Sequence, residues 1–295
     1  MLSLALFGKL VHMYNRSEGF FKGYEDLELF FQIWENPIAR GTVIITHGQG
    51  EHSESYHRLI KAFENDAWTF YGWDLRGHGR SAGKRGFVAE FDDYCKDYQI
   101  FLDQVLAQEK VKKGPVVLYC HSMGGLIELK TLIRNPNLKI DAIVVSAPLL
   151  GLSIPVPAVK SVGASVINKI MPSITMHNEI NNQMLTRDPD VIREYEQDPL
   201  RHNRISPGAF LGFLESFDYV LPRANEIKKP ALFILPEKDP IVNTPAARAF
   251  YDKLGSTRKE IYLYPEAKHE LINELNRKTV FADIKKFLDS VLESK

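Results

Sequence analysis

The sequence has few cysteines, no long apolar run and no excess of charge of either sign. It holds 2 cysteines in 295 residues, and its 37 lysines and arginines match 37 aspartates and glutamates. Cys95 and Cys120 are too few for a disulfide framework, and no cysteine–histidine cluster has the spacing of zinc ligands. The balanced charge provides no basic face for nucleic acid. We therefore expect reduced thiols in a cytoplasmic protein, with no metal site and no nucleic-acid partner.

Membrane-spanning segments are also lacking. No stretch approaches the roughly eighteen apolar residues that a spanning helix needs. The N-terminal stretch MLSLALFGKLV (1–11) is apolar, but it has no preceding positive charge and no small-residue cleavage site, so it does not resemble a signal peptide. We expect it to pack on the domain or rest on a lipid surface. Peripheral contact with a membrane or micelle surface thus stays open.

The sequence does contain a regular alternation of apolar and amphipathic runs. Near-continuous apolar runs separated by helices with a 3.6-residue apolar period are typical of a parallel sheet covered on both faces. Strands are predicted over 27–35, 41–47, 68–74, 115–120, 140–147, 230–236 and 259–265. Helices are predicted over 53–63, 91–106, 123–134, 245–254 and at the C-terminus. The pattern predicts an α/β fold with a doubly wound, mostly parallel sheet.

Residues 151–222 interrupt this alternation with several prolines and with helical fragments at 158–171 and 208–217. We predict a helical cap insertion above the carboxyl ends of the strands, where such sheets bind ligands. The chain would then comprise a first core part (1–150), the cap (151–222) and a second core part (223–295). Its apolar residues either form the cap's own core or line an acyl-chain tunnel whose mouth docks on a lipid surface. They are Leu152, Ile154, Val156, Val159, Ile167, Ile170, Met171 and Ile174.

The stretch VVLYCHSMGGLIEL (116–129) places Ser122 where a predicted strand becomes a helix. A serine on such a sharp turn needs small neighbours, as in the G-x-S-x-G nucleophile elbow. The pentapeptide here is CHSMG, with Gly124 present and Cys120 in place of the first glycine. Because cysteine is also small, the motif still predicts a nucleophile. The alternative is that Ser122 only caps the helix.

A serine nucleophile needs a base, and the base needs a carboxylate that holds it in the right tautomer. In this fold the partners follow in the order serine, acid, histidine, each after a late strand. Asp239 follows the strand at 230–236 and His269 follows the strand at 259–265. Alternatively, Asp239 is a turn residue before Pro240 and His269 caps a helix. The shared order of all three favours a Ser122–Asp239–His269 triad.

An oxyanion hole needs two backbone N–H groups aimed at the developing negative charge. Met123 follows the nucleophile at a helix N-terminus, and Gln49 lies in the glycine-containing loop 45–53 after an early strand. We predict these two as the donors, with His47 bracing the loop. The glycine-rich stretch DLRGHGRSAGKRG (74–86) is interpreted as a structured loop, although its charged residues look catalytic in isolation.

Five motifs together give a specific resemblance: HGQGEHS, DLRGHGRSAGKRG, HSMGG, the acid after a late strand, and YPEAKHELINE. In order and spacing the chain resembles the monoacylglycerol lipase and bacterial lysophospholipase branch of the α/β-hydrolases, from about Glu18 to the C-terminus. The segment LTRDPDVIREYEQDPL (185–200) is similar to the cap of that branch. The resemblance implies the α/β-hydrolase fold and hydrolysis of esters of single-chain lipids, without metal or organic cofactor. It implies Ser122, Asp239 and His269 as the triad.

The sequence departs from that branch at three positions. Cys120 replaces the usual elbow glycine, Gln49 stands where alanine is frequent, and Ser55 stands where arginine is frequent. The last departure leaves a head-group contact unfilled. Glu51 and Tyr195 remain as candidates for polar contacts to the head group, with structural hydrogen bonding as their alternative role.

The predicted reaction is hydrolysis of a single-acyl-chain lipid ester, most simply a monoacylglycerol, through an acyl-enzyme on Ser122. A lysophospholipase or an acyltransferase would use the same triad. A lipid-binding protein without activity is the alternative from a different class. The sequence indicates no oligomeric state.

Overall fold

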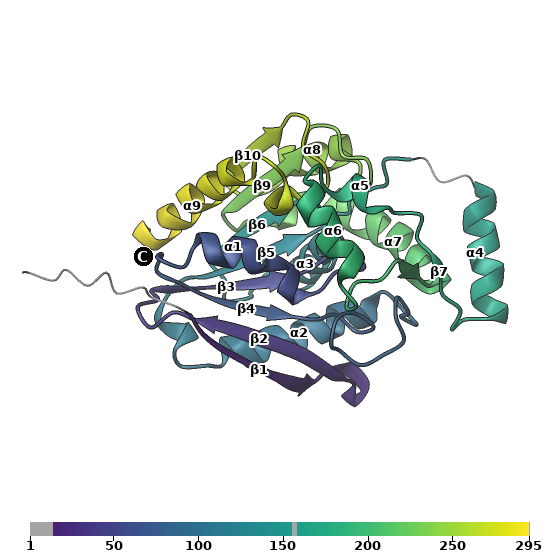
Figure 1. Ribbon diagram of the computed structural model, residues 1–295, viewed down its shortest axis with the longest axis horizontal. Helices are drawn as coiled ribbons and strands as arrows, with labels where there is room; N and C mark the ends of the chain where they lie inside the picture. Colours follow the sequence, from purple (N-terminus) through teal and green to yellow (C-terminus); the bar gives the residue numbers. More distant parts are fainter. Residues whose placement is uncertain (1–13, 155–157, 295) are drawn as a thin grey trace, which may run out of the picture.

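The computed structural model describes residues 14–154 and 158–294 and is built around one eight-stranded sheet (Figure 1). In spatial order the strands are β1-β2-β4-β3-β5-β6-β9-β10. Their bounds are β1 Asn15–Lys22, β2 Glu28–Glu35, β3 Gly41–Thr46, β4 Trp68–Trp73, β5 Val116–His121, β6 Ala142–Ser146, β9 Ala231–Pro236 and β10 Lys259–Tyr264. Strands β1 and β2 pair antiparallel, as do β2 and β4, and the remaining neighbours are parallel. The predicted α/β-hydrolase fold with a mostly parallel sheet is confirmed.

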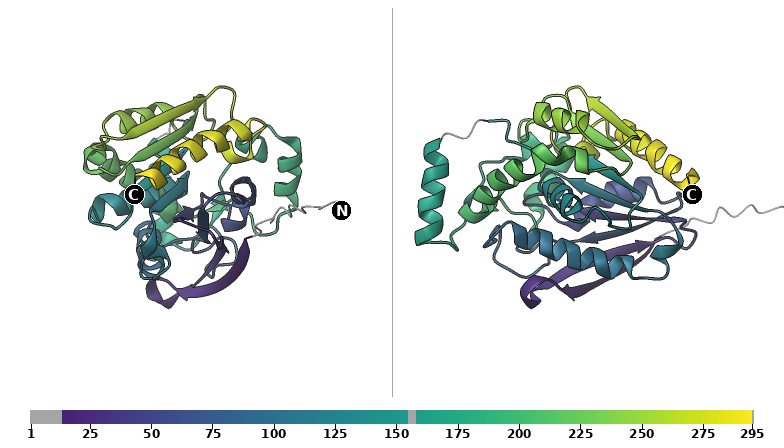
Figure 2. Two further views of the ribbon diagram at one scale, coloured as in Figure 1. Left: turned by 90° about the vertical axis from the view of Figure 1, so that its left-hand side faces the viewer. Right: turned by 180° about the vertical axis from the view of Figure 1, so that it is seen from behind.

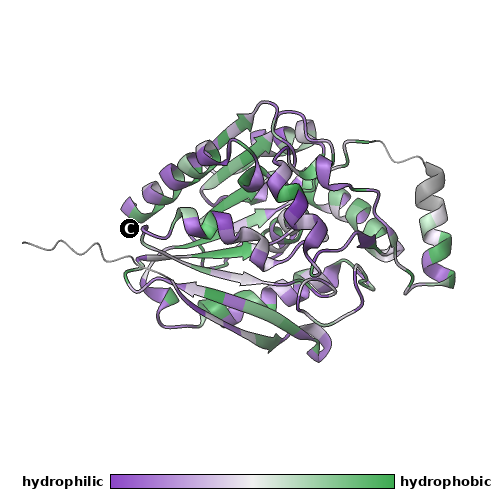
Figure 3. Cartoon of the chain, viewed as in Figure 1, coloured by the Kyte–Doolittle hydropathy of each residue, from purple (hydrophilic) through white to green (hydrophobic). Residues whose placement is uncertain are grey.

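Helices cover both faces of the sheet, which Figure 2 shows from two further sides. The buried clusters place α2, α3 and α8 on one face and α1 and α9 on the other. Their bounds are α1 His57–Ala62, α2 Asp92–Leu106, α3 Met123–Arg134, α8 Thr244–Asp252 and α9 Arg277–Glu293. Along β5, Leu118 and Cys120 join the first cluster whereas Val117 and Tyr119 join the second. A strand buried on both sides is apolar throughout, as the green central strands in Figure 3 show.

Short 3-10 turns connect several of these elements. A turn at Ser53–Tyr56 precedes α1, so the helix predicted over 53–63 begins as a tighter turn. The others lie at Tyr24–Asp26, Val111–Lys113, Leu221–Glu226 and Leu271–Asn273. Strand β1 was not predicted, because most of its residues are exposed and its sequence has no apolar run.

The 151–222 segment lies between β6 and β9 in the chain and adds helices and a separate two-stranded sheet, but no strand of the main sheet. Its elements are α4 Ala158–Ile170, β7 Met176–His177, α5 Asn182–Leu185, α6 Pro189–Gln197, β8 Arg204–Ile205 and α7 Pro207–Val220. Helices α4 and α7 match the fragments predicted at 158–171 and 208–217. In Figure 1, α5 and α6 lie beside the sheet and α4 stands at the outer edge of the molecule.

Two predictions concern residues outside the described part. The N-terminal stretch 1–11 and Val156 are not described. In the ranges that are described, no helix combines the length and apolar character needed to cross a bilayer.

Candidate functional site

Ser122 occupies the turn between β5 and α3 with φ 53° and ψ −119°. A non-glycine residue in this region of backbone space is strained and persists only where its surroundings hold it. Its N–H donates to Ser146 O at 3.0 Å, and its carbonyl accepts from Leu149 N at 2.9 Å. The structure thus confirms the sharp strand-to-helix turn and anchors it to the end of β6.

Small residues allow neighbouring backbone segments to approach this turn closely. A Cβ on Gly124 would lie 2.4 Å from Thr46 O, and one on Gly48 would lie 3.0 Å from the Cβ of Ser122. Cys120 is buried in the core cluster that includes α3, where its Sγ is 3.8 Å from the position of a Cβ on Gly125. The strained turn therefore forms with cysteine in place of glycine.

Asp239 follows β9 and His269 follows β10, and their side chains meet. His269 Nδ1 and Asp239 Oδ2 are 2.7 Å apart, and the other Asp239 oxygen accepts from the N–H groups of Ile241 and Val242 at 2.8 and 3.1 Å. Burial opposes charge on both groups, but the attraction between the imidazolium and the carboxylate outweighs burial. This attraction raises the pKa of His269 and lowers the pKa of Asp239. Asp239 is therefore ionised and orients the His269 imidazole through this hydrogen bond.

The loop after β3 lies against the start of α3. His47 holds this loop from within, because its Nδ1 contacts Gly48 O at 2.7 Å and its Nε2 accepts from Leu75 N at 2.9 Å. His47 thus has the bracing role predicted from sequence. Among the backbone hydrogen bonds of turns and loops in the described residues, none is donated by the N–H group of Gln49 or Met123.

The stretch 74–86 is a structured loop, as predicted. Asp74 accepts from Ser53 N at 2.7 Å and from Arg80 N at 2.8 Å. Arg76 forms a buried ion pair with Asp97 at 2.6 Å. The side chains of Asp74 and Arg76 are therefore paired within the core and have a structural role.

A buried polar cluster lies beside His269. Its members are Glu51, Tyr195, Arg201 and Glu270. Arg201 pairs with Glu270 at 2.8 Å and stacks over the Tyr195 ring at 3.7 Å, and the Tyr195 hydroxyl donates to Glu270. Burial raises the pKa of Glu270, but Arg201 outweighs it and holds this pKa at about 2. The cluster thus contains one ionised, fully paired carboxylate.

Glu51 differs from Glu270 in its protonation. Its Oε1 accepts from Gly48 N at 2.5 Å and from the Tyr56 hydroxyl at 3.0 Å. Burial and the nearby charge of Glu270 raise the pKa of Glu51 to about 7, although Arg201 opposes the shift. Glu51 therefore changes charge near neutral pH while it supports the loop that carries Gln49.

Sequence reasoning missed Arg201 and Glu270. Ser55 was expected to leave a head-group contact unfilled, yet Arg201 reaches Ser55 Oγ at 3.4 Å from the 151–222 segment. A guanidinium therefore reaches Ser55 from a distant part of the chain. Glu270 could have been flagged by its position directly after His269, but nothing local indicates its partner.

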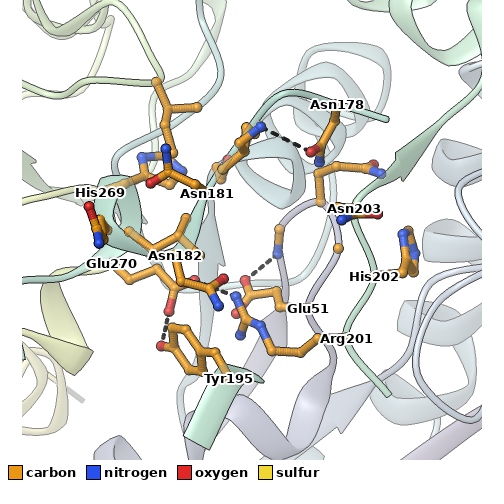
Figure 4. Close-up of a pocket in the computed structure, with 18 of the residues that line it drawn as sticks. Glu51, Asn178, Asn181, Asn182, Tyr195, Arg201, His202, Asn203, His269 and Glu270 are labelled. Atoms are coloured by element: carbon orange, nitrogen blue, oxygen red, sulfur yellow. Dashed lines mark hydrogen bonds and ion pairs between the residues drawn. The ribbon is translucent and has the colours of Figure 1, made fainter. Parts of the chain in front are cut away.

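These residues surround one cavity of about 780 Å³ (Figure 4). Of the predicted site residues, the cavity brings together Ser122, His269, Gln49, Glu51 and Tyr195. Asp239 lies behind His269, and Met123 adjoins Ser122 in the chain; neither lines the cavity. The described members of the apolar set proposed for an acyl tunnel do not line it either; they are Leu152, Ile154, Ile167, Ile170, Met171 and Ile174. The aliphatic side chains that do are Ile180, Leu185, Ile192 and Ile241.

The described residues contain no group of three or more histidine, cysteine, aspartate or glutamate side chains arranged to hold a metal ion. Cys95 and Cys120 are both buried with free thiols.

Comparisons with known proteins identify a family and several relatives. The family model described as "Serine aminopeptidase, S33" matches residues 37–276. A monoacylglycerol lipase of Mycolicibacterium smegmatis is 29% identical over 94% of this chain and 99% of its own length. Phospholipase YtpA of Bacillus subtilis is 26% identical over 88% of this chain and 98% of its own. The crystal structure of Paleococcus ferrophilus monoacylglycerol lipase superposes with a TM-score of 0.81 at 29% identity, covering 90% of this chain and 99% of that one.

Proposed function

Because the chain belongs to the serine aminopeptidase S33 family of hydrolases, we propose that Ser122, Asp239 and His269 are its catalytic triad. With relatives named as monoacylglycerol lipases, the family match makes the chain a carboxylic ester hydrolase. A phospholipase among the relatives points to lipid esters as a class. Within that class, the proposed substrates are esters of a single acyl chain, with monoacylglycerol the simplest.

The observation that carries the proposal is the His269–Asp239 hydrogen bond beside the strained Ser122 turn. With Nδ1 bound to Asp239, Nε2 is the nitrogen left to remove the Ser122 proton. Ser122 Oγ then attacks the ester carbonyl, and the alcohol leaves with the proton from His269. Water repeats the sequence on the acyl-enzyme. Asp239 stays ionised throughout and stabilises the imidazolium.

The oxyanion donors are the N–H groups of Gln49 and Met123. Gly48 packs on Ser122 and Gly124 packs on the end of β3, so the two donors are carried by segments in direct contact. The α3 dipole adds to the stabilisation at Met123.

The 151–222 segment serves as the cap in this proposal, and Glu51 and Tyr195 contribute to the polar end of the cavity. A cytoplasmic location and contact with a membrane or micelle surface remain predictions.

Labelling with a fluorophosphonate tests the triad directly. We expect one covalent adduct, mapped by mass spectrometry to Ser122 and lost in Ser122→Ala, whereas the exposed Ser17→Ala variant labels normally. No adduct on the folded protein would favour a lipid-binding protein.

A second assay separates the reactions. With a radiolabelled acyl ester, hydrolysis yields free fatty acid, whereas an acyltransferase would move the label to added glycerol. Turnover of an aminoacyl amide without turnover of any acyl ester would contradict the ester assignment.

A further inference from the structure

Six side-chain amides line the cavity that Ser122 and His269 also line, and one of them is Gln49 in the loop after β3. The other five belong to Asn178, Asn181, Asn182, Gln183 and Asn203, and we call this set the amide rim. All five come from the 151–222 segment, and Figure 4 labels four of them around the pocket. An amide both donates and accepts hydrogen bonds, which is also what a hydroxyl group does. The rim therefore has the chemistry to bind a hydroxyl-rich group.

The local fold fixes how part of the rim is presented. Asn178 Oδ1 accepts from Ile180 N at 3.1 Å, and Asn181 Oδ1 accepts from Met184 N at 3.2 Å. With each oxygen held by the backbone, the NH₂ group of each amide remains as a donor. Asn203 Nδ2 contacts His177 Nε2 at 2.8 Å across the β7–β8 pair.

Two members of the rim are free. Within the described residues, the side chains of Asn182 and Gln183 make no hydrogen bond to the protein. Both line the cavity, so their amides are available to a ligand.

The charge of the cavity argues against an anionic head group. Arg201 is the only lysine or arginine among the lining residues that the structure describes, and it is paired with Glu270. Glu51 and Glu196 also line the cavity. A phosphate here would meet carboxylates and no free guanidinium or ammonium group.

Two of the four histidines that line the cavity, His121 and His202, do not supply positive charge. Burial lowers the pKa of His121 to about 3 and that of His202 to about 4. Both rings are therefore neutral at pH 7, and an uncharged ligand is the better match.

The extent of the polar lining indicates a group larger than glycerol. Glu51, Tyr195, Arg201 and Glu270 already form one polar cluster beside His269, and the amide rim adds a second set of polar groups on the 151–222 segment. The four aliphatic side chains that line the cavity give a single acyl chain its apolar contacts. The cavity volume of about 780 Å³ lies within the range of pockets that enclose whole small-molecule ligands.

We propose that the amide rim binds an uncharged, hydroxyl-rich head group, so that the preferred substrate is a monoacylated glycosylglycerol rather than a monoacylglycerol or a lysophospholipid. This proposal rests on the proposed ester hydrolysis at Ser122 and adds the identity of the head group. A site that hydrogen-bonds substrate hydroxyls discriminates against esters that lack them.

The test is a panel of four esters with the same acyl chain in the same detergent micelles. The head groups are glycerol, galactosylglycerol, glycerophosphocholine and glycerophosphoglycerol. We expect kcat/KM for the galactosylglycerol ester to exceed that for the glycerol ester about tenfold, which is the effect of two net hydrogen bonds. The two phosphate-containing esters should be the poorest substrates. Equal values for glycerol and galactosylglycerol, or a preference for either phosphate ester, would overturn the proposal.

The double variant Asn182→Ala/Gln183→Ala tests the rim itself. Because these two side chains have no protein partner, the variant should keep the wild-type fold by circular dichroism. The galactosylglycerol-to-glycerol ratio of kcat/KM should fall several-fold toward one. Asn137→Ala, an exposed amide far from the cavity, should leave the ratio unchanged. An unchanged ratio in the double variant would remove the rim from head-group recognition.

The panel also separates this proposal from the one it rests on. If Ser122 is labelled by fluorophosphonate and the glycerol ester is hydrolysed without any galactosyl preference, only the head-group proposal fails. If no ester is hydrolysed and Ser122 is not labelled, the catalytic proposal fails.

Discussion

The strand ends and the 151–222 segment hold their polar side chains in different ways. Ser122, Asp239 and His269 are 7%, 7% and 3% exposed, and each directly follows or lies just beyond a strand of the main sheet. The amide rim instead lies on or beside short elements, the four-residue α5 and the two-residue strands β7 and β8. The core thus fixes the proposed triad, whereas the residues proposed to bind the head group lie on short elements that can be substituted without disturbing the core.

Many hydrogen bonds and ion pairs join the two regions, and three of them lie near the cavity. Arg201 pairs with Glu270, His202 N donates to Gly50 O at 3.0 Å, and Gln49 Nε2 donates to Arg204 O at 2.7 Å. The loop that carries Gln49 is therefore bonded to the segment that carries the rim. Substitutions at the strand ends should therefore mainly affect activity, and substitutions at this junction should mainly affect stability.

Asp239→Asn, a substitution just beyond the end of β9, should give the largest loss of activity. An amide cannot hold His269 in the required tautomer or stabilise its charged form, so kcat should fall on the order of 10⁴-fold with little change in KM. Steady-state kinetics on a monoacyl ester, with urea unfolding as a check of folding, measure this.

The matched control is Asp252→Asn on the surface of α8, which should retain wild-type kcat. A kcat for Asp239→Asn within tenfold of wild type would remove Asp239 from the triad.

Arg201→Met acts at the junction of the two regions and should mainly affect stability. It leaves Glu270 buried without its cation, a change that typically costs about 3–5 kcal/mol. The urea midpoint of the single variant should fall accordingly. The double variant Arg201→Met/Glu270→Gln should recover most of the loss, because no uncompensated charge remains. Equal losses in both variants would show that the ion pair does not join the segment to the core.

The sequence predicted which side chains lie at the strand ends, but it did not predict the junction. Ser122, Asp239 and His269 were proposed together because each follows a predicted strand and the fold brings parallel strand ends together. The structure pairs Asp239 with His269 and places Ser122 and His269 on one cavity. The pairing of Arg201 with Glu270 and its approach to Ser55 have no local signal, since they depend on how the 151–222 segment folds back. The amide rim was missed for the same reason, because isolated asparagines in loops are ordinarily turn residues.

Glu128→Gln tests how a carboxyl group buried in the core affects stability as the pH changes. Burial raises the pKa of Glu128 to about 8, although hydrogen bonds from the Cys120 thiol and from the Tyr98 hydroxyl at 3.0 Å oppose the shift. Below pH 4.5 the group is protonated in both states. As pH rises from about 4.5 to 8, the unfolded chain ionises and the folded one does not, so stability is progressively lost.

Glutamine has no charge to gain, so the variant should lose less stability over this range. The difference should reach on the order of 4 kcal/mol by pH 8, since one unit of pKa corresponds to about 1.4 kcal/mol. Urea unfolding at pH 5 and pH 8 measures it, and Glu215→Gln, exposed on α7, is the control. Parallel pH dependence in wild type and Glu128→Gln would show that Glu128 is not held neutral.

Cys120→Ala should have the smallest effect, although the residue lies two positions from the nucleophile. Its thiol is buried in the same core cluster as Cys95, so removal of either sulfur leaves a small cavity that costs about 1 kcal/mol. The strained turn is held by backbone bonds at Ser122 and by the space at Gly124 and Gly48, none of which involves the sulfur. Cys120→Ala and Cys95→Ala should therefore lose similar stability and label with fluorophosphonate at the wild-type rate. A slower rate in Cys120→Ala alone would mean that the thiol, and not only the backbone around it, sets the geometry of the elbow.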